Sequence, residues 1–169
     1  MSRKSTINVI ERVKVIGTSK AKGLIDFHNF SGAGWDGKYV GISKETWMTA
    51  YLSISDEDNI ICTFQQLGTF PLLITDFSGC LPANVSPLER FLCSLYAPDT
   101  CPIRKVPDLR WMLFRTKNIE GEKLPPTLPT LFLHILRCNF ISLRNKSYTN
   151  AHLSTCPLVT CHRVRLGGS

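Results

Sequence analysis

Acid–base, nucleophilic and metal chemistry in this 169-residue chain would depend on its histidines, cysteines and carboxylates. Nucleophilic catalysis needs a cysteine or serine beside a histidine, but no local nucleophile signature surrounds any cysteine. Cys156, Cys161 and His162 form the one cluster with zinc-ligand spacing, and it lacks a fourth ligand. Two-metal phosphate chemistry needs converging carboxylates. Six aspartates are instead scattered along the chain: Asp26, Asp36, Asp56, Asp58, Asp76 and Asp108. Most of them lie at helix starts or in loops, where capping explains them. We therefore predict no catalytic residue, no metal and no cofactor.

The seven cysteines indicate a reducing compartment. Their number is odd and no two have CxxC spacing, while the first residues (MSRKSTINVIERVKV) lack the apolar segment of a signal peptide. We expect an intracellular protein, nuclear or cytoplasmic, with no glycan at the sequons of Asn29, Asn84 and Asn145. Polar residues interrupt every long apolar stretch, so no membrane partner is expected.

Residues 28–47 (HNFSGAGWDGKYVGISKETW) contain a glycine-rich turn, then Lys44 and a helix that Ser43 can cap. Backbone N–H groups in such a turn, beside a helix N-terminus, can hold a phosphate. Glycine-rich turns also serve simply to reverse the chain. The residue pattern leaves both interpretations open.

The net charge of +7 belongs to the back of the chain. Residues 1–100 carry nine Lys and Arg against ten Asp and Glu, and residues 101–169 carry eleven against three. This excess can attract nucleic-acid phosphates or form an ordinary solvated surface. The basic residues expected on helices, and so the candidate phosphate contacts, are Arg110, Arg115, Lys117, Arg137 and Arg144.

Five helices are predicted from capping residues and apolar spacing of three to four residues. Ser43 caps the first helix, Asp56 caps the second, and Gly68 ends the second. Ser86 and Glu89 form a capping box at the third helix. The predicted ranges are 43–54, 57–67, 86–96, 107–117 and 129–144.

The fold class predicted from these elements is all-α, with five to six amphipathic helices that bury their stripes against one another. The stripe of the last helix is expected to be Leu131, Phe132, Ile135, Leu136, Phe140 and Leu143. Residues 1–19 are expected to form a loosely structured lead-in, 20–146 a helical domain, and 147–169 a loose tail. A short extended piece is expected at 71–75 within a loop.

Several motifs also match a known pattern in the same order. The first group of matching residues is His28, Phe30, Ser31, Gly32, Ala33, Tyr39, Gly41, Ser43, Lys44 and Trp47. The later matches are residues 88–96, 109–114 (LRWMLF), 124–127 (LPPT) and 134–139 (HILRCN). Together they resemble the C-terminal half of a PIN-like, flap-endonuclease-like domain in uncharacterised animal proteins that are often associated with mobile elements. The resemblance covers about residues 20–150.

This resemblance implies the helical C-terminal part of a PIN-like domain without its parallel sheet, because the half that supplies the strand-end carboxylates is missing. The positions that correspond to the family motif are His28, Gly32, Gly34, Asp36, Gly41 and Lys44. Gly34 stands where the family has its metal-ligand Asp, and Asp36 lies two residues later. One displaced Asp cannot hold two divalent cations.

We therefore expect a non-catalytic fragment of a mobile-element-derived PIN-like protein, with weak, non-specific binding to nucleic acid through phosphates. One alternative is a metal-dependent nuclease that a partner chain completes, which would use Mg or Mn. Another is a protein-interaction module in which a partner protein covers an exposed apolar face.

Overall fold

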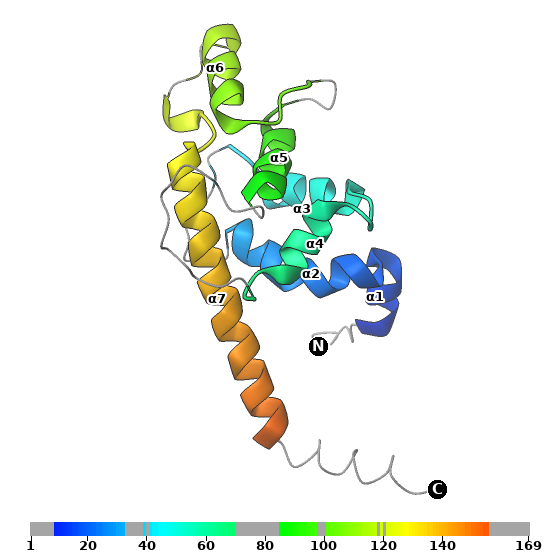
Figure 1. Ribbon diagram of the computed structural model, residues 1–169. Coiled ribbons are helices and arrows are strands. Elements are labelled where there is room, and N and C mark those ends of the chain that lie inside the picture. The colour runs from blue at the N-terminus through cyan, green and yellow to red at the C-terminus, as the bar shows by residue number, and fades with distance from the viewer. Residues whose placement is uncertain are drawn as a thin grey trace, which may run out of the picture.

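The computed structural model describes residues 9–32, 39, 41–69, 85–97, 101–117, 119 and 121–155. All regular secondary structure in these residues is helical (Figure 1). The elements are α1 (Val9–Ile16), α2 (Thr18–Phe30), α3 (Lys44–Ser53), α4 (Asn59–Gln66), α5 (Val85–Tyr96), α6 (Val106–Lys117), a 3-10 turn η1 (Gly121–Lys123) and α7 (Leu128–Thr155). The predicted all-α class is confirmed for the described residues, with seven α-helices where five to six were expected.

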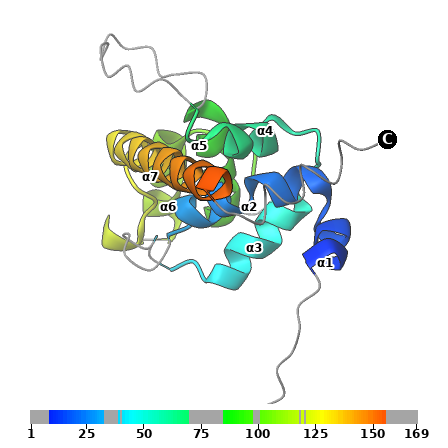
Figure 2. The same cartoon turned by 90° about the horizontal axis from the view of Figure 1, so that it is seen from below.

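Helix α7 runs along one side of the molecule, and α1 and α3 lie on the other side (Figure 1 and Figure 2). Helix α2 packs against both α4 and α7, while α5 contacts α3, α4, α6 and α7. Helix α6 stands at the end of the molecule where α7 begins, and the last turns of α7 extend past the other helices (Figure 1). A large part of the surface of α7 is therefore not covered by the bundle.

An aromatic cluster forms the centre of the bundle. Phe27 stacks on Tyr51 with ring centroids 4.2 Å apart, and Phe64 meets Phe91 edge-on at 5.5 Å. Trp47 lies 5.8 Å from Phe91, and all five side chains are buried. Such aromatic pairs stabilise a fold by about 0.5–1.5 kcal/mol each beyond the area that they bury. The core therefore joins α2, α3, α4 and α5.

Helices α3 to α6 begin and end within two residues of their predicted bounds. Ser43 caps α3 as predicted, because its side chain accepts a hydrogen bond from the Thr46 backbone N–H at 3.1 Å. Asp56 was predicted to cap α4, and this is wrong. Asp58 is the cap, and its Oδ1 accepts from the backbone N–H of Ile60 at 2.8 Å.

The capping box predicted at Ser86 is also wrong, because α5 begins one residue earlier, at Val85. Glu89 is buried and reaches another helix. Its Oε1 accepts from the backbone N–H of Val106 at 2.8 Å, and its Oε2 lies 3.1 Å from Lys105 Nζ. Glu89 thus satisfies a donor at the start of α6, where a carboxylate also complements the helix dipole.

The lead-in expected at residues 1–19 is largely helical in its described part, since α1 and the start of α2 lie within it. Gly17, with φ of 91°, separates the two helices. The sequence pattern missed α2 because its buried positions are mixed in character: Gly23, Asp26, Phe27, Asn29 and Phe30. Packing against α4 and α7 supplies the stability that local periodicity does not indicate.

The tail expected at residues 147–169 is helical from 147 to 155, because α7 continues to Thr155. Residues 156–169 and the extended piece predicted at 71–75 lie outside the described residues. The stripe predicted for this helix is only partly correct. Leu131 and Ile135 are buried, but Phe140 and Leu143 are 54% and 42% exposed.

Candidate functional site

The described part of the predicted phosphate-binding segment connects the end of α2 to the start of α3. Lys44 Nζ donates to the carbonyl oxygen of Ser31 at 3.0 Å and to its Oγ at 2.9 Å. Ser31 is the C-cap of α2, where unsatisfied carbonyls and the negative end of the helix dipole favour a cation. Lys44 therefore stabilises a helix end, which accounts for its place after the glycines.

The described motif positions other than Lys44 are two turn glycines and an exposed histidine. Gly32 and Gly41 have positive φ values of 88° and 83°. A Cβ at Gly41 would meet nothing within 4 Å, so glycine there serves the turn and not a close approach. His28 is exposed on α2, and Gly34 and Asp36 lie outside the described residues.

A buried polar seam, which the sequence analysis did not predict, joins α2 and the end of α4 to α7. Its members are Asp26, Asn29, Asn139, Ser142 and Lys146. Asn29 Nδ2 donates to Ser142 Oγ at 3.2 Å, and the Gly68 backbone N–H donates to Asn139 Oδ1 at 2.6 Å. Buried polar groups that are hydrogen-bonded in this way fix the register of the helices that carry them.

The charged end of the polar seam is an ion pair. Lys146 Nζ lies 3.1 Å from Asp26 Oδ2, and the Asp26 side chain is only 4% exposed. The same ammonium also donates to the carbonyl oxygens of Gln65 and Leu67. Lys146 thus satisfies the C-terminal carbonyls of α4 while it neutralises a buried carboxylate.

Cys138 and His134 are close enough to suggest a nucleophile and its base, with Sγ 3.4 Å from Nε2. However, the same Nε2 lies 2.8 Å from the carbonyl oxygen of Phe30, which can only accept. Nε2 therefore carries a hydrogen and cannot take the thiol proton of Cys138. Cys138 is fully buried and lies 3.6 Å from the Asn29 carbonyl oxygen. The pair is explained by packing between α7 and α2.

Tyr39 lies beside this pair, with its ring centroid 5.2 Å from that of His134. Burial raises the pKa of Tyr39 well above its ordinary value, and its hydroxyl has no hydrogen-bond partner among the described residues. Within the same part of the chain, no group of three or more His, Cys, Asp and Glu is arranged to hold a metal ion.

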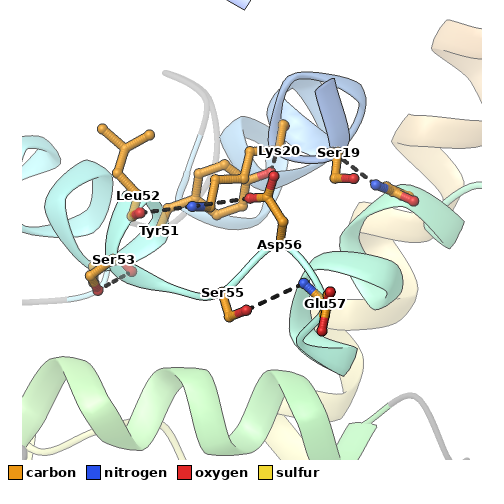
Figure 3. Close-up of polar contacts among 10 residues, drawn as sticks. Ser19, Lys20, Tyr51, Leu52, Ser53, Ser55, Asp56 and Glu57 are labelled. Carbon is orange, nitrogen blue, oxygen red and sulfur yellow. Dashed lines mark hydrogen bonds and ion pairs between the residues drawn. The ribbon is translucent and has the colours of Figure 1, made fainter. Parts of the chain in front are cut away.

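Asp56, which was predicted as a cap, ties α2 to the connection between α3 and α4 (Figure 3). Lys20 Nζ lies 3.2 Å from Asp56 Oδ1 and donates to the Leu52 carbonyl oxygen at 2.9 Å. Tyr51 completes the junction, since its hydroxyl donates to the Lys20 carbonyl oxygen at 2.7 Å. Burial raises the pKa of Tyr51 above its ordinary value. The junction is therefore a structural clamp.

A cleft of about 740 Å³ lies between α3, the start of α4 and α5. Its hydroxyl-bearing residues are Ser43, Thr46, Thr49, Ser53, Ser55 and Ser94. Arg90 and Arg104 also line the cleft, but so do Asp58 and Glu45, and Arg90 Nη2 lies 2.5 Å from Asp58 Oδ1. The formal charges of the two arginines and the two carboxylates that line the cleft therefore sum to zero.

One of the predicted nucleic-acid contacts has a structural role, and three others have exposed side chains. Arg110 is structural, because its Nη1 donates to the carbonyl oxygen of Pro125 and so attaches α6 to the turn before α7. The side chain of Lys117 is not among those that the structure describes. The predicted contacts with exposed side chains are Arg115, Arg137 and Arg144.

Helix α7 carries a second apolar surface on the side opposite the bundle. We call it the outward face of α7, defined by Leu133, Arg137, Phe140, Leu143, Arg144 and Tyr148. Leu133 is 60% exposed and Tyr148 is 61% exposed. The residues around a hollow of about 470 Å³ on this face are Phe140, Leu143, Arg144, Ser147 and Tyr148. Of the surfaces described here, it is the one with large apolar side chains in a repeating row.

No protein-family model, curated protein or solved structure matches the chain. No described helix is long and apolar enough to cross a membrane. The function must therefore be inferred from the residues of the chain and their contacts.

Proposed function

We propose that this chain is a non-catalytic protein-interaction module, and that its partner binds the outward face of α7. The observation that carries the proposal is that α7 has large apolar side chains on the side away from the bundle as well as on the side that packs against it. Leu131 and Ile135 are buried against the bundle, while Leu133, Phe140 and Leu143 are between 42% and 60% exposed. The apolar side chains on the side away from the bundle are the surface that a partner would cover.

The arrangement of these exposed side chains indicates a binding surface and not the scattered exposure of single residues. Single exposed apolar residues are common on proteins, but contiguous patches mark interaction sites. Leu133 and Phe140 are seven residues apart and Leu143 follows three residues later, which places them on one side of a helix. Anchors at this spacing are typical of a helix that packs its apolar side against another protein.

The experiment is a selection of helical peptides from a phage-displayed library against the full chain. We expect enriched peptides to bind with micromolar affinity. Phe140→Asp should weaken that binding at least tenfold, or about 1.4 kcal/mol. Met48→Asp is the matched control, because Met48 is an exposed apolar residue on α3. Enriched peptides that bind Phe140→Asp as well as they bind the native chain would exclude the outward face.

A second candidate function is binding to single-stranded nucleic acid, and the stacked pair of Trp111 and Phe114 on α6 favours it. Their ring centroids are 6.5 Å apart with an interplanar angle of 29°, and the side chains are 64% and 54% exposed. Arg115 is exposed on the same helix. Exposed aromatic rings beside arginines can stack on bases and attract phosphates.

Titration of labelled oligothymidine and duplex DNA at low and high salt tests this second candidate. Binding that falls steeply with salt is expected to be reduced in an Arg115→Ala/Arg137→Ala/Arg144→Ala variant. Arg110 is left unchanged because it holds Pro125. Lys22→Ala, at an exposed site on α2, is the charge control. Absence of binding at low salt would remove the candidate.

We further propose, from the motif resemblance, that the chain descends from a PIN-like nuclease and has no nuclease activity of its own. Gly34 at the position of the motif Asp supports this. Flap, single-stranded and duplex substrates with Mg or Mn should remain uncut. Cleavage that an Asp36→Asn variant loses would contradict the proposal and favour the nuclease alternative.

A further inference from the structure

We infer that the occupant of the outward face of α7 is an acidic amphipathic helix, with carboxylates on the flank that lies against Arg137 and Arg144. The inference rests on the proposed function and adds the chemical class of the partner. It depends on three features of α7: the spacing of its apolar residues, the placement of its charges, and the hollow on its surface.

The apolar spacing suits a second helix better than it suits an extended strand. Leu133, Phe140 and Leu143 follow the three- and seven-residue spacing at which two packed helices exchange side chains. From Leu133 to Leu143 the helix rises about 15 Å, at about 1.5 Å per residue. A partner helix of three turns or more can therefore contact the whole row at once.

The charges of α7 select an acidic partner. The helix contains Arg137, Arg144 and Lys146 and no Asp or Glu, and Lys146 is directed to the polar seam. The two arginines are exposed and seven residues apart, so they lie on the same side of α7, about 10.5 Å apart along its axis. Carboxylates seven residues apart on a partner helix would match this spacing, and such complementarity steers association and fixes orientation.

The hollow of about 470 Å³ provides a seat for an apolar anchor of the partner. Phe140 and Leu143 supply its apolar wall, and Ser147 and Tyr148 line it further along the helix. The guanidinium carbon of Arg144 lies 6.0 Å from the centroid of the Tyr148 ring, an arrangement that holds the charge at the rim. An apolar side chain in the hollow and a carboxylate at its rim are thus recognised together.

Other occupants fit these features less well. A second copy of the chain would place cations opposite cations, because α7 has no anion to offer. A nucleic-acid strand would use the arginines and Tyr148 but would leave Leu133 and Leu143 against water. An anionic lipid surface meets both the charge and the apolar requirement, but it does not use the spacing of the two arginines. The acidic helix is the occupant that uses every feature.

The test is fluorescence anisotropy with the full native chain and three synthetic helical peptides of about 21 residues, or three heptads. All three peptides carry leucine at the first and fourth positions of each heptad. They differ only at one flanking position of each heptad, which is Glu in the first peptide, Gln in the second and Lys in the third. We expect the Glu peptide to bind at least tenfold more tightly than the Gln peptide at low salt, with the difference shrinking at high salt. The Lys peptide should bind most weakly.

Variants separate charge from apolar contact. Arg137→Ala/Arg144→Ala should remove the preference for Glu over Gln, while Arg115→Ala on α6 should leave it intact. Phe140→Asp should weaken all three peptides. Equal binding of the three peptides, with sensitivity to Phe140→Asp, would overturn the acidic partner and leave the proposed function standing. Failure of all three to bind would overturn both proposals.

Three further outcomes would also count against the acidic helix. One is dimerisation of the native chain in sedimentation that Phe140→Asp abolishes. Another is displacement of the Glu peptide by oligothymidine. The third is tighter binding to vesicles that contain phosphatidylserine than to the Glu peptide. Each would assign the outward face to a different occupant.

Discussion

On the side that faces the bundle, the second half of α7 carries Asn139, Ser142 and Lys146, all with partners on α2 or at the end of α4. On the opposite side, the same turns carry Phe140 and Leu143, which are about half-exposed. The usual distribution of polar and apolar residues is thus inverted between the two faces. Polar side chains are buried where they can be satisfied, and apolar ones are left at the surface.

Burial in α7 is therefore decided by hydrogen-bonding partners as well as by hydrophobicity. A buried amide or ammonium stabilises a packed interface only when its partners lie in one geometry, because an unsatisfied buried polar group costs about 1–3 kcal/mol. The polar seam therefore fixes how α7 lies against α2. The outward face has no such restriction, and its apolar residues suit a partner added after folding.

Replacing a leucine by alanine should change the free energy of unfolding very differently on the two faces of α7. Leu131→Ala should lower the free energy of unfolding by about 2–5 kcal/mol, because Leu131 is fully buried and leaves a cavity. Leu133→Ala removes a side chain that is 60% exposed and should change the free energy of unfolding by about 0.5 kcal/mol or less. Urea denaturation of the two variants measures the difference, and equal losses would show that both faces are packed.

Breaking the ion pair of the polar seam should have the next largest effect. Lys146→Met leaves the Asp26 carboxylate buried without a cation, which costs about 3–5 kcal/mol for a fully buried pair. The lower end is expected, because the Lys146 side chain is 39% exposed. Arg144→Met, on the outward face, is the matched control and should cost about 0.5 kcal/mol or less.

The double variant Asp26→Asn/Lys146→Met sharpens this test. It removes the uncompensated charge and should therefore recover part of the stability that Lys146→Met loses. Recovery measured by chemical denaturation would locate the loss in the carboxylate. If the double variant loses as much as the sum of the two single variants, Asp26 and Lys146 do not act on each other.

A smaller effect is expected at Asn139. Asn139→Ala leaves the Gly68 backbone N–H without its acceptor, at a cost of about 1–3 kcal/mol. Ser147→Ala is the control on the exposed side of α7, since Ser147 is exposed and its hydroxyl donates to the Leu143 carbonyl oxygen of the same helix. Thermal unfolding followed by circular dichroism compares the two. A loss at Ser147 as large as that at Asn139 would remove the distinction between the faces.

Local sequence rules predicted those helices whose buried face is apolar. In α4 and at its C-cap, for example, the apolar residues that gave the predicted three- to four-residue spacing are all buried, because one apolar stripe meets one core: Ile60, Ile61, Phe64 and Leu67. Cap residues were less reliable. Ser43 was correct, whereas Asp56 and Ser86 were wrong, because a suitable side chain cannot show which of several adjacent residues begins the helix.

The same rules failed where tertiary partners decide. Gly23 and Asp26 give α2 no apolar period, yet it packs against both α4 and α7. In α7, apolar residues occur on two sides, so periodicity could not show which side faces the bundle. The buried side of α7 carries Asn139, Ser142 and Lys146. This row of polar residues can be assigned to the buried side only when its partners on α2, Asp26 and Asn29, are known.

The labelling rates of the native cysteines compare the two faces of α7 without any substitution, so the free energy of unfolding is unaltered. Cys138 lies on the inward side of α7 and is fully buried, whereas Cys62 on α4 is exposed. Cys93 is also buried, and burial raises the pKa of its thiol to about 12. The reactive thiolate is therefore rare at Cys93, and a reagent must wait for the structure to open at both buried sites.

Timed iodoacetamide labelling with peptide mass spectrometry should show Cys62 modified at least tenfold faster than Cys93 and Cys138, since about 1.4 kcal/mol of opening free energy already gives a factor of ten. Rapid labelling of Cys138 together with slow labelling of Cys93 would mean that α7 detaches while the aromatic core stays closed. The inward face of α7 would then be exposed for part of the time, and its two faces would differ only while the helix is packed.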